Sequence, residues 1–283
     1  MQVGKPKYHL VSFSGGKDST AMLLRMMELD YPIDEVLFCD TTMEFPAMLR
    51  HIEKVKAVVE AAGIKFTTLR GERSFEYLML EHEPKRRSGS GEKGRGYSWP
   101  DHLNRWCTLY LKTQVITVYK RLLRDEYEVI EYVGIAADEQ YRLERKMNQA
   151  EEKRHPLVDW GWAESDALAY CYSKGYDWEG LYDHFKRVSC WCCPLSNLDE
   201  LRTLRKFYPE LWQKLGELDT QTWRDFKAGG WSVERLDRRF ALEEALTENG
   251  YRIKGKQFHT DLRRHCFEDV PIETILRERT DGV

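Results

Sequence analysis

The chain lacks the marks of membrane and secreted proteins. Its 283 residues contain no apolar run near the roughly 20 residues that a membrane-spanning helix needs, and Met1–Leu10 carries no apolar leader segment. Its seven cysteines are an odd number and are unevenly spread, which argues against a disulfide framework. We therefore expect a cytoplasmic protein that does not bind a membrane.

An excess of charge of one sign is also missing. The chain has 44 basic and 47 acidic residues and a formal charge of −3, so its surface as a whole is not that of a nucleic-acid-binding protein. Hydrophobic residues make up 42% and 19 glycines are present, as in globular proteins, which excludes wholesale disorder. The length fits one large domain, or one domain with an appendage. Any nucleic-acid site must be a local basic patch.

A glycine pair follows the first β-rich segment. His9–Phe13 is a short β-rich run, residues 14–19 read SGGKDS, and helical spacing begins directly after them. Adjacent glycines let the backbone turn tightly and bring its N–H groups close to an anion, at which the next helix points its positive end. Ser14 and Ser19 add hydroxyl donors, and Lys17 adds a cation. Asp18 can hold Mg²⁺ directly or through water.

SGGKDS resembles the PP-loop of the adenine nucleotide α-hydrolases, which bind the β,γ-pyrophosphate of ATP and cleave its α–β bond. The resemblance implies ATP and Mg²⁺ as cofactors and Lys17, Asp18 and Ser19 as catalytic residues. The nucleotide-binding residues that it implies here are Ser14, Gly15, Gly16, Lys17, Asp18 and Ser19. The alternative is a glycine turn that only caps a helix.

A second motif follows the second expected strand, Glu35–Asp40. Residues 40–46 read DTTMEFP and lie at the carboxyl end of that strand, where doubly wound sheets bind ligands. They resemble the D-T-G-x-x-F-P segment of the phosphoadenosine phosphosulfate (PAPS) reductase family, with Thr42 in place of the glycine. The resemblance implies that Asp40 and Thr41 lie near the adenosine. Asp40 as a turn former or a helix cap is the alternative.

Two later segments resemble the same family. A helix that opens at residues 105–108 (RWCT) contains Lys112, where the family has a basic residue that faces the nucleotide. The expected strand Val129–Ala136 leads into a stretch similar to the family's G-x-R-x-x-E-S-x-x-R, with Ala136 in place of the arginine. Glu139 and Arg142 keep the match, and guanidinium groups suit phosphate recognition. Surface helix charges are the alternative for Arg142 and for Arg145.

The order of elements defines the expected fold. A helix from Pro46, a third strand at Lys65–Leu69 and a helix from Ala163 to Lys174 complete a repeated strand–helix pattern. We expect a Rossmann-like α/β fold of the HUP and PP-loop type: a twisted, parallel, five-stranded sheet of order 3-2-1-4-5, flanked by helices. Residues 1–195 are expected to form the nucleotide-binding domain, and residues 196–283 a helical C-terminal region.

A basic insertion near residues 83–105 interrupts this pattern. It lacks apolar residues between Glu83 and Gly96, and its basic residues are Lys85, Arg86, Arg87, Lys93 and Arg95. We interpret it as a flexible cationic segment. Closure over phosphates, binding of a nucleic acid, and a merely solvated loop all stay open.

A cysteine cluster lies at residues 190–193 (CWCC). Adenylylsulfate-type members of the family carry an iron–sulfur cluster on a cysteine pair near the Cys107 position and on a downstream C-x-x-C. The resemblance implies Cys107, Cys190, Cys192 and Cys193 as metal ligands. Cys192, Cys266 and His102 compete for the fourth place, because only Cys107 represents the first pair. A [4Fe–4S] cluster, Zn²⁺, and buried or redox-active thiols without metal stay open.

These motifs favour an ATP α–β cleaving enzyme that adenylylates an acceptor for sulfur transfer or thiolation. SGGKDS is intact, whereas the late Cys266 does not match the nucleophile motif of PAPS reductases. The alternatives are a PAPS or adenylylsulfate reductase, a sulfate adenylyltransferase subunit, and a nucleotide sensor without catalysis. The acceptor could be a small molecule, tRNA or DNA, and a homo-oligomer is open.

Overall fold

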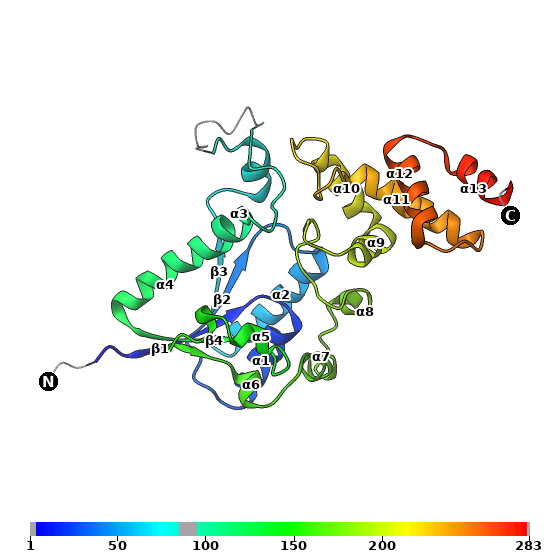
Figure 1. Cartoon of the computed structure of the whole chain (residues 1–283). Coiled ribbons are helices and arrows are strands. Elements are labelled where there is room, and N and C mark those ends of the chain that lie inside the picture. Colours follow the sequence, from blue (N-terminus) through cyan, green and yellow to red (C-terminus); the bar gives the residue numbers. More distant parts are fainter. Residues whose placement is uncertain (1–3, 85–94, 282–283) are drawn as a thin grey trace. The chain divides into compact units, whose positions relative to one another are not determined.

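A computed structural model describes residues 4–84 and 95–281 (Figure 1). The chain divides into two compact units, each made of two stretches. The first unit comprises Met1–Phe75 and Asn104–Trp191, and the second comprises Glu76–Leu103 and Cys192–Val283. Residues 76–84 and 95–103 thus belong to the same unit as the C-terminal helices. The sequence analysis expected them in the domain 1–195. Lys85, Arg86, Arg87 and Lys93 lie outside the described residues.

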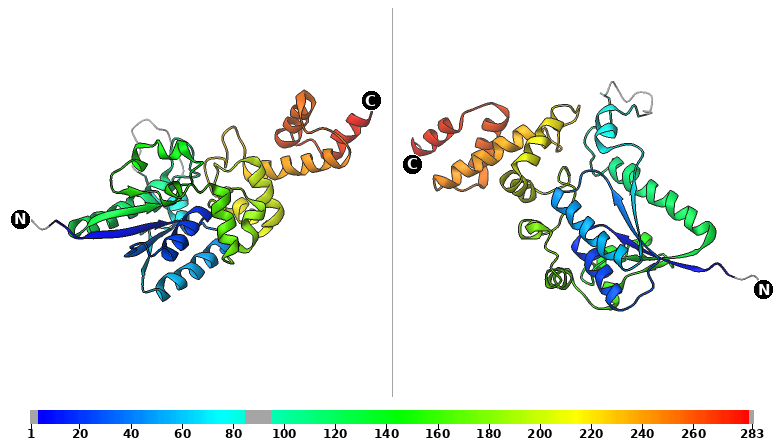
Figure 2. Two further views of the ribbon diagram at one scale, coloured as in Figure 1. Left: turned by 90° about the horizontal axis from the view of Figure 1, so that it is seen from below. Right: turned by 180° about the vertical axis from the view of Figure 1, so that it is seen from behind.

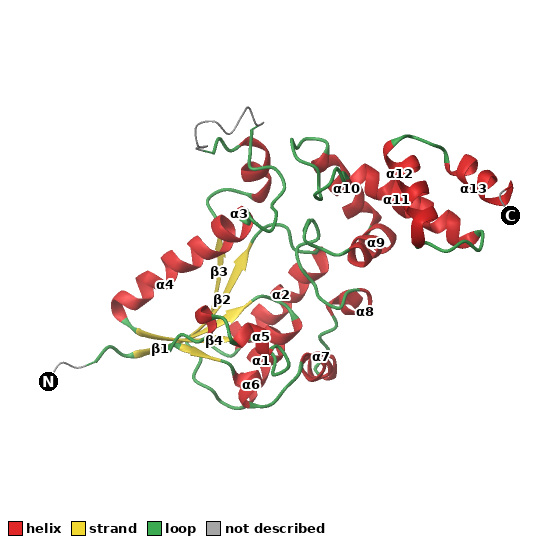
Figure 3. Ribbon diagram, in the orientation of Figure 1, coloured by secondary structure: helices red, strands yellow, loops and turns green. Residues whose placement is uncertain are grey.

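The first unit is built on a parallel five-stranded sheet of order β3-β2-β1-β4-β5 (Figure 3). Its strands are β1 Lys7–Phe13, β2 Glu35–Asp40, β3 Lys65–Arg70, β4 Glu128–Val133 and β5 Lys153–Arg154. The predicted strand order and fold class are therefore confirmed. Since β1 pairs with β2 on one side and with β4 on the other, the loop after β1 lies where the strand order reverses, which is where open α/β sheets bind ligands.

Helices cover both faces of this sheet (Figures 1 and 2). The α-helices of the first unit are α1 Lys17–Glu28, α2 Pro46–Ala61, α3 Trp106–Thr108, α4 Gln114–Glu126, α5 Gln140–Leu143, α6 Pro156–Asp159, α7 Glu164–Ser173 and α8 Leu181–His184. Right-handed crossovers place α1 and α2 on one face and α4 on the other. Ile116, Tyr119 and Leu123 of α4 pack over a core formed by one residue each from β1, β2 and β4.

Glycines set two boundaries next to the site. Gly15, with φ +81°, turns the chain from β1 into α1. The strand predicted to reach Ala136 ends at Val133, so that prediction was three residues too long. At Gly134 the backbone comes so close to α1 that an added Cβ would lie 2.9 Å from the Cα and the N of Ser19. β4 therefore fixes where the first turn of α1 lies.

A buried carboxylate joins elements at the opposite end of the sheet. Glu35 is fully buried at the start of β2, and its pKa lies below the usual value. Burial alone would raise that pKa, but hydrogen bonds from neighbouring donors outweigh it. The donors are Thr67, Tyr119 at 2.6 Å, Tyr8 at 2.9 Å and Lys65 at 3.1 Å. This network joins β1, β2, β3 and α4 through one ionised group.

The second unit is helical, as predicted for the C-terminal region. It contains α9 Leu198–Phe207, α10 Pro209–Asp219, α11 Val233–Glu248, α12 Gly255–Phe267 and α13 Ile272–Asp281. Trp99, from the earlier stretch of this unit, is fully buried edge-on against Phe226, and its Nε1 donates to Asp219 at 2.7 Å. No helix among the described residues has the length and apolar character that crossing a lipid bilayer requires.

We expect Gly134→Ala to destabilise the first unit by about 1–3 kcal/mol. The new methyl group overlaps backbone atoms of α1, and these cannot rotate out of the way as a side chain can. Urea unfolding measures this loss. Gly216→Ala is the matched control: the added Cβ in α10 would lie 3.9 Å from Val233, and alanine favours the helix, so stability should be unchanged or rise by up to about 1 kcal/mol. Equal effects of the two changes would contradict the close approach.

Candidate active site at the first loop

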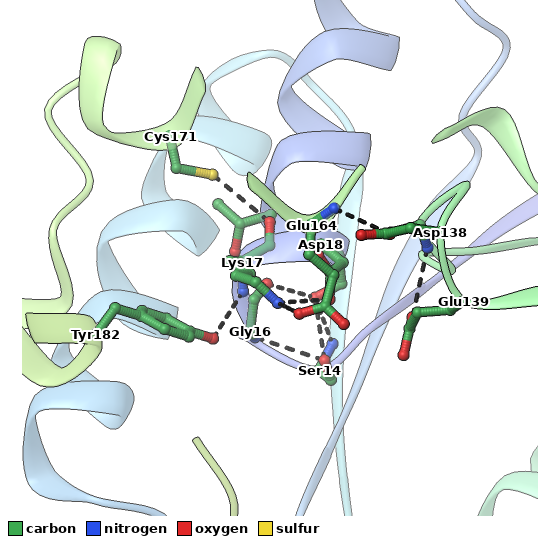
Figure 4. Close-up of polar contacts among 12 residues, drawn as sticks. Ser14, Gly16, Lys17, Asp18, Asp138, Glu139, Glu164, Cys171 and Tyr182 are labelled. Atoms are coloured by element: carbon green, nitrogen blue, oxygen red, sulfur yellow. Dashed lines mark hydrogen bonds and ion pairs between the residues drawn. The ribbon is translucent and has the colours of Figure 1, made fainter. Parts of the chain in front are cut away.

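The loop of residues 14–19 has a fixed conformation (Figure 4). The Oγ atoms of Ser14 and Ser19 lie 3.1 Å apart, and Ser19 Oγ also donates to the carbonyl oxygen of Gly16 at 3.0 Å. An added Cβ at Gly15 would lie 2.8 Å from side-chain atoms of Met48 and Ile52, so α2 leaves room only for glycine. Gly16 precedes α1 and has no side chain with which to cap it, so the first N–H groups of the helix need acceptors from elsewhere.

Lys17 carries a buried cation. The residue is only 7% exposed, and its Nζ lies 2.5 Å from Oε2 of Glu164 and 3.3 Å from Oδ2 of Asp18. Its backbone N–H donates to the hydroxyl of Tyr182 at 2.9 Å. Burying an ammonium group is tolerated only with such partners. The predicted phosphate-binding lysine is thus held in place by residues of α7 and α8.

Asp18 has one oxygen to spare. Its Oδ1 is buried and has no hydrogen-bond partner among the described residues. Burial raises the pKa of Asp18 to about 6; Lys17 opposes this shift and Glu164 adds to it. A carboxylate oxygen without a donor at the N-terminus of a helix fits a ligand of Mg²⁺ beside a bound phosphate, because Mg²⁺ is held by carboxylates together with substrate phosphates.

Polar residues after β4 interact with other protein groups rather than standing free. Asp138 accepts the backbone N–H of Glu164 at 3.1 Å and so orients the start of α7. Glu139 is buried and pairs with Arg142 at 2.5 Å. The family resemblance predicts that Glu139 and Arg142 lie at the nucleotide. In the structure each neutralises the other, and Arg142 stays about one-third exposed.

Asp40 acts as a turn former at the end of β2. Its Oδ1 accepts the backbone N–H of Thr42 at 2.7 Å, and its Oδ2 accepts from Arg70. Thr42 has a φ of +69°, a conformation that favours the glycine found in the family motif. Asp40 therefore shapes the turn, and its contact with a nucleotide stays a prediction.

Thr41 and Lys112 meet at a carboxylate that sequence analysis did not single out. Thr41 Oγ1 donates to Glu44 at 2.7 Å, and Nζ of Lys112 lies 4.0 Å from the same Glu44 oxygen. Burial raises the pKa of Glu44, and Lys112 opposes the rise. Thr41 Oγ1 also lies 3.6 Å from the thiol of Cys190. The tertiary structure thus brings Thr41, a predicted nucleotide-binding residue, next to one predicted metal ligand.

The predicted metal ligands fall in both units. Cys107 and Cys190 belong to the first unit, and Cys192 and Cys193 belong to the second. Across residues 4–84 and 95–281, no three His, Cys, Asp or Glu side chains are grouped as a bound metal requires. Because these four residues are divided between two units, we derive no chemical step through a cluster or a zinc ion. The four-cysteine assignment stays a prediction.

Cys266 does not fit the remaining place for a ligand or the role of a nucleophile. It is 2% exposed in the core formed by α11, α12 and α13. Burial raises the pKa of its thiol to about 11, so the thiolate is scarce at neutral pH.

Comparison with known proteins decides the family. Residues 8–196 match the phosphoadenosine phosphosulfate reductase domain. The chain belongs to this family. The match covers the sheet, the first loop and residues 190–193, so it includes most of the residues that the sequence motifs had indicated.

The relatives of this family member are less informative. Two uncharacterised proteins of Methanocaldococcus jannaschii are 29% identical over 220 residues and 28% identical over 209 residues. Each match covers 72% of the chain but only 40% and 45% of the relative, so the chain spans less than half the length of these curated relatives. The U34-tRNA thiolase NcsA from Methanococcus maripaludis, solved with its [4Fe-4S] cluster, is 13% identical with a TM-score of 0.38 over 75% of this chain and 71% of that one.

Asp18→Asn tests the electrostatics of the site. The folded pKa of Asp18 is raised from 3.8 to about 6, so the stability given by its neutral form is fully present below about pH 4 and is lost as the pH rises through 6. We expect the variant to be about 1–3 kcal/mol more stable than the wild type at pH 7.5 and equally stable near pH 4. Denaturant unfolding at both pH values checks this. A stability difference that does not change with pH would contradict it.

Proposed function

We propose that this family member binds Mg-ATP at the loop Ser14–Ser19 and cleaves the α–β bond, transferring the adenylyl group to an acceptor in a sulfur-transfer or thiolation reaction. The observation that carries the proposal is the buried Lys17 ammonium at the N-terminus of α1, next to the partnerless oxygen of Asp18. A cation, a helix N-terminus and a spare carboxylate oxygen are the groups that a magnesium pyrophosphate needs.

The geometry suits a pyrophosphate leaving group. Lys17 and the first turn of α1 neutralise charge that builds up on the β-phosphate as the α–β bond breaks. An oxygen of the acceptor attacks the α-phosphorus, the new P–O bond forms, and the bridging oxygen leaves with the pyrophosphate. Mg²⁺, brought with the nucleotide and held by Asp18, would withdraw charge from the phosphates. A sulfur nucleophile then displaces AMP from the adenylylated acceptor.

The main alternative, a PAPS or adenylylsulfate reductase, loses one of its two candidate nucleophiles. A reductase needs a reactive thiolate, and Cys266 is enclosed in an apolar core with a raised pKa. A reductase that uses one of the thiols at residues 190–193 stays compatible with the fold. A sulfate adenylyltransferase subunit also stays open, since it needs the same loop and no thiol.

Lys17→Ala tests the proposal. Without the ammonium group the leaving pyrophosphate loses a fixed positive charge, and we expect pyrophosphate release from Mg-ATP, with water as the acceptor, to fall by about 10²–10³-fold. Lys206→Ala, which removes an exposed lysine of α9, is the control and should leave the rate unchanged. Calorimetry with Mg-ATP measures binding separately. A wild-type protein that ignores ATP and binds PAPS would overturn the proposal in favour of the reductase.

The thiols need a separate measurement. Anaerobic purification with a visible spectrum and iron and zinc analysis distinguishes the three predicted states of residues 190–193. If these residues hold a metal, Cys190→Ser should lower the metal content per chain and Cys266→Ser should not, because Cys266 lies within the apolar core. An equal metal content in both variants and in the wild type would contradict the cysteine assignment.

A further inference from the structure

The two groups of Lys17 that would bind a phosphate are already engaged by other residues. Its ammonium lies 2.5 Å from Oε2 of Glu164, and its backbone N–H donates to the hydroxyl oxygen of Tyr182 at 2.9 Å; both contacts are drawn in Figure 4. A carboxylate oxygen and a phenol oxygen accept hydrogen bonds from these donors as phosphate oxygens do. Glu164 and Tyr182 therefore accept hydrogen bonds from the same two donors that would bind the nucleotide in the proposed function.

This arrangement has a physical cause. A buried ammonium and the first N–H groups of a helix both need acceptors, whether or not a ligand is bound. Glu164 is the first residue of α7, and Asp138 fixes its backbone by accepting its N–H. The same segment is therefore positioned to supply Lys17 with a negative charge in place of a phosphate.

The Glu164 side chain is more exposed to solvent than the side chains of Lys17 and Asp18, so it can move away from Lys17 more easily. It is 41% exposed, whereas the side chains of Lys17 and Asp18 are 9% and 18% exposed. A carboxylate beside an incoming phosphate would repel it, because both groups carry negative charge. Tyr182 is different: burial raises its pKa, so its hydroxyl stays protonated and can donate to a phosphate oxygen.

We propose that Glu164 is an internal competitor of the nucleotide phosphate: it holds the Lys17 ammonium until the phosphate displaces it and so sets the affinity of the loop for pyrophosphate groups. Glu164 acts through Lys17 and is a positioning residue. The inference rests on the proposed function, because it assumes that Lys17 binds the pyrophosphate group of a nucleotide.

Two opposite effects of Glu164→Gln follow. Without ligand the variant is less stable, because Lys17 loses the carboxylate at 2.5 Å and, among the described residues, keeps only Asp18 as an ion-pair partner. With ligand it binds more tightly, because the anion no longer competes with a carboxylate. We expect the Kd for inorganic pyrophosphate with Mg²⁺ to fall about tenfold, and pyrophosphate to raise the Tm of the variant by more than it raises that of the wild type.

Calorimetry and thermal unfolding with inorganic pyrophosphate test the inference in the full-length protein. Glu179→Gln is the matched control: Glu179 is an exposed glutamate of the same unit that pairs with Arg50, and its loss should leave the Kd unchanged. Weaker or unchanged binding by Glu164→Gln would overturn the inference, as would a loss of Tm that pyrophosphate does not restore. A purely structural role for Glu164 predicts that last result.

The same experiment separates this inference from the proposed function. If the wild type binds neither pyrophosphate nor Mg-ATP, the proposed function fails. If the wild type binds both, Lys17→Ala abolishes binding, and Glu164→Gln binds like the wild type, then only the competition by Glu164 fails. Steady-state kinetics add a further readout: competition predicts that KM for Mg-ATP falls in Glu164→Gln, whereas loss of a catalytic group would lower kcat alone.

Discussion

The burial of one positive charge organises this site. Lys17 sits at the N-terminus of α1 with almost no access to water, and an ammonium in such a place must be surrounded by acceptors. Asp18 lies next to it in sequence, but Glu164 and Tyr182 lie 147 and 165 residues further along the chain. The requirement therefore ties the first loop of the sheet to helices that the chain forms much later. It also fixes which residues accept hydrogen bonds from Lys17.

Close packing of backbone against backbone holds this charge in position. Gly15 turns against α2 with no room for a side chain, and Gly134 brings the end of β4 against the first turn of α1. The loop is thus fixed from two sides by residues that carry no chemistry. Its hydroxyl groups are hydrogen-bonded within the loop, so the proposed binding of a pyrophosphate group would need little reordering. Such preorganisation favours electrostatic stabilisation of a leaving group.

The family motif and the structure disagree in an instructive way at β2. Thr42 adopts a positive φ at the position where the family has glycine. The two carboxylate oxygens of Asp40 accept hydrogen bonds from the backbone of Thr42 and from Arg70. The carboxylate next to Thr41 and Lys112 is Glu44, whose raised pKa reflects its burial. The adenosine side of the proposed site is therefore less defined by the motif than the phosphate side.

The sequence indicated the strand order through its repeated strand–helix pattern, because the crossovers between parallel strands are right-handed. It indicated the turn at residues 14–19 because a glycine pair between a strand and a helix allows a tight turn. Sequence also determined the helical character of the C-terminal region. It could not determine the roles of Glu164, Tyr182 and Gly134, since an acid, a phenol and a glycine outside any motif carry no sign of their distant neighbours. Nor could it tell that Cys266 is enclosed or that Glu139 and Arg142 pair. Those outcomes depend on which surfaces the fold removes from water, and that is decided only when distant segments pack together.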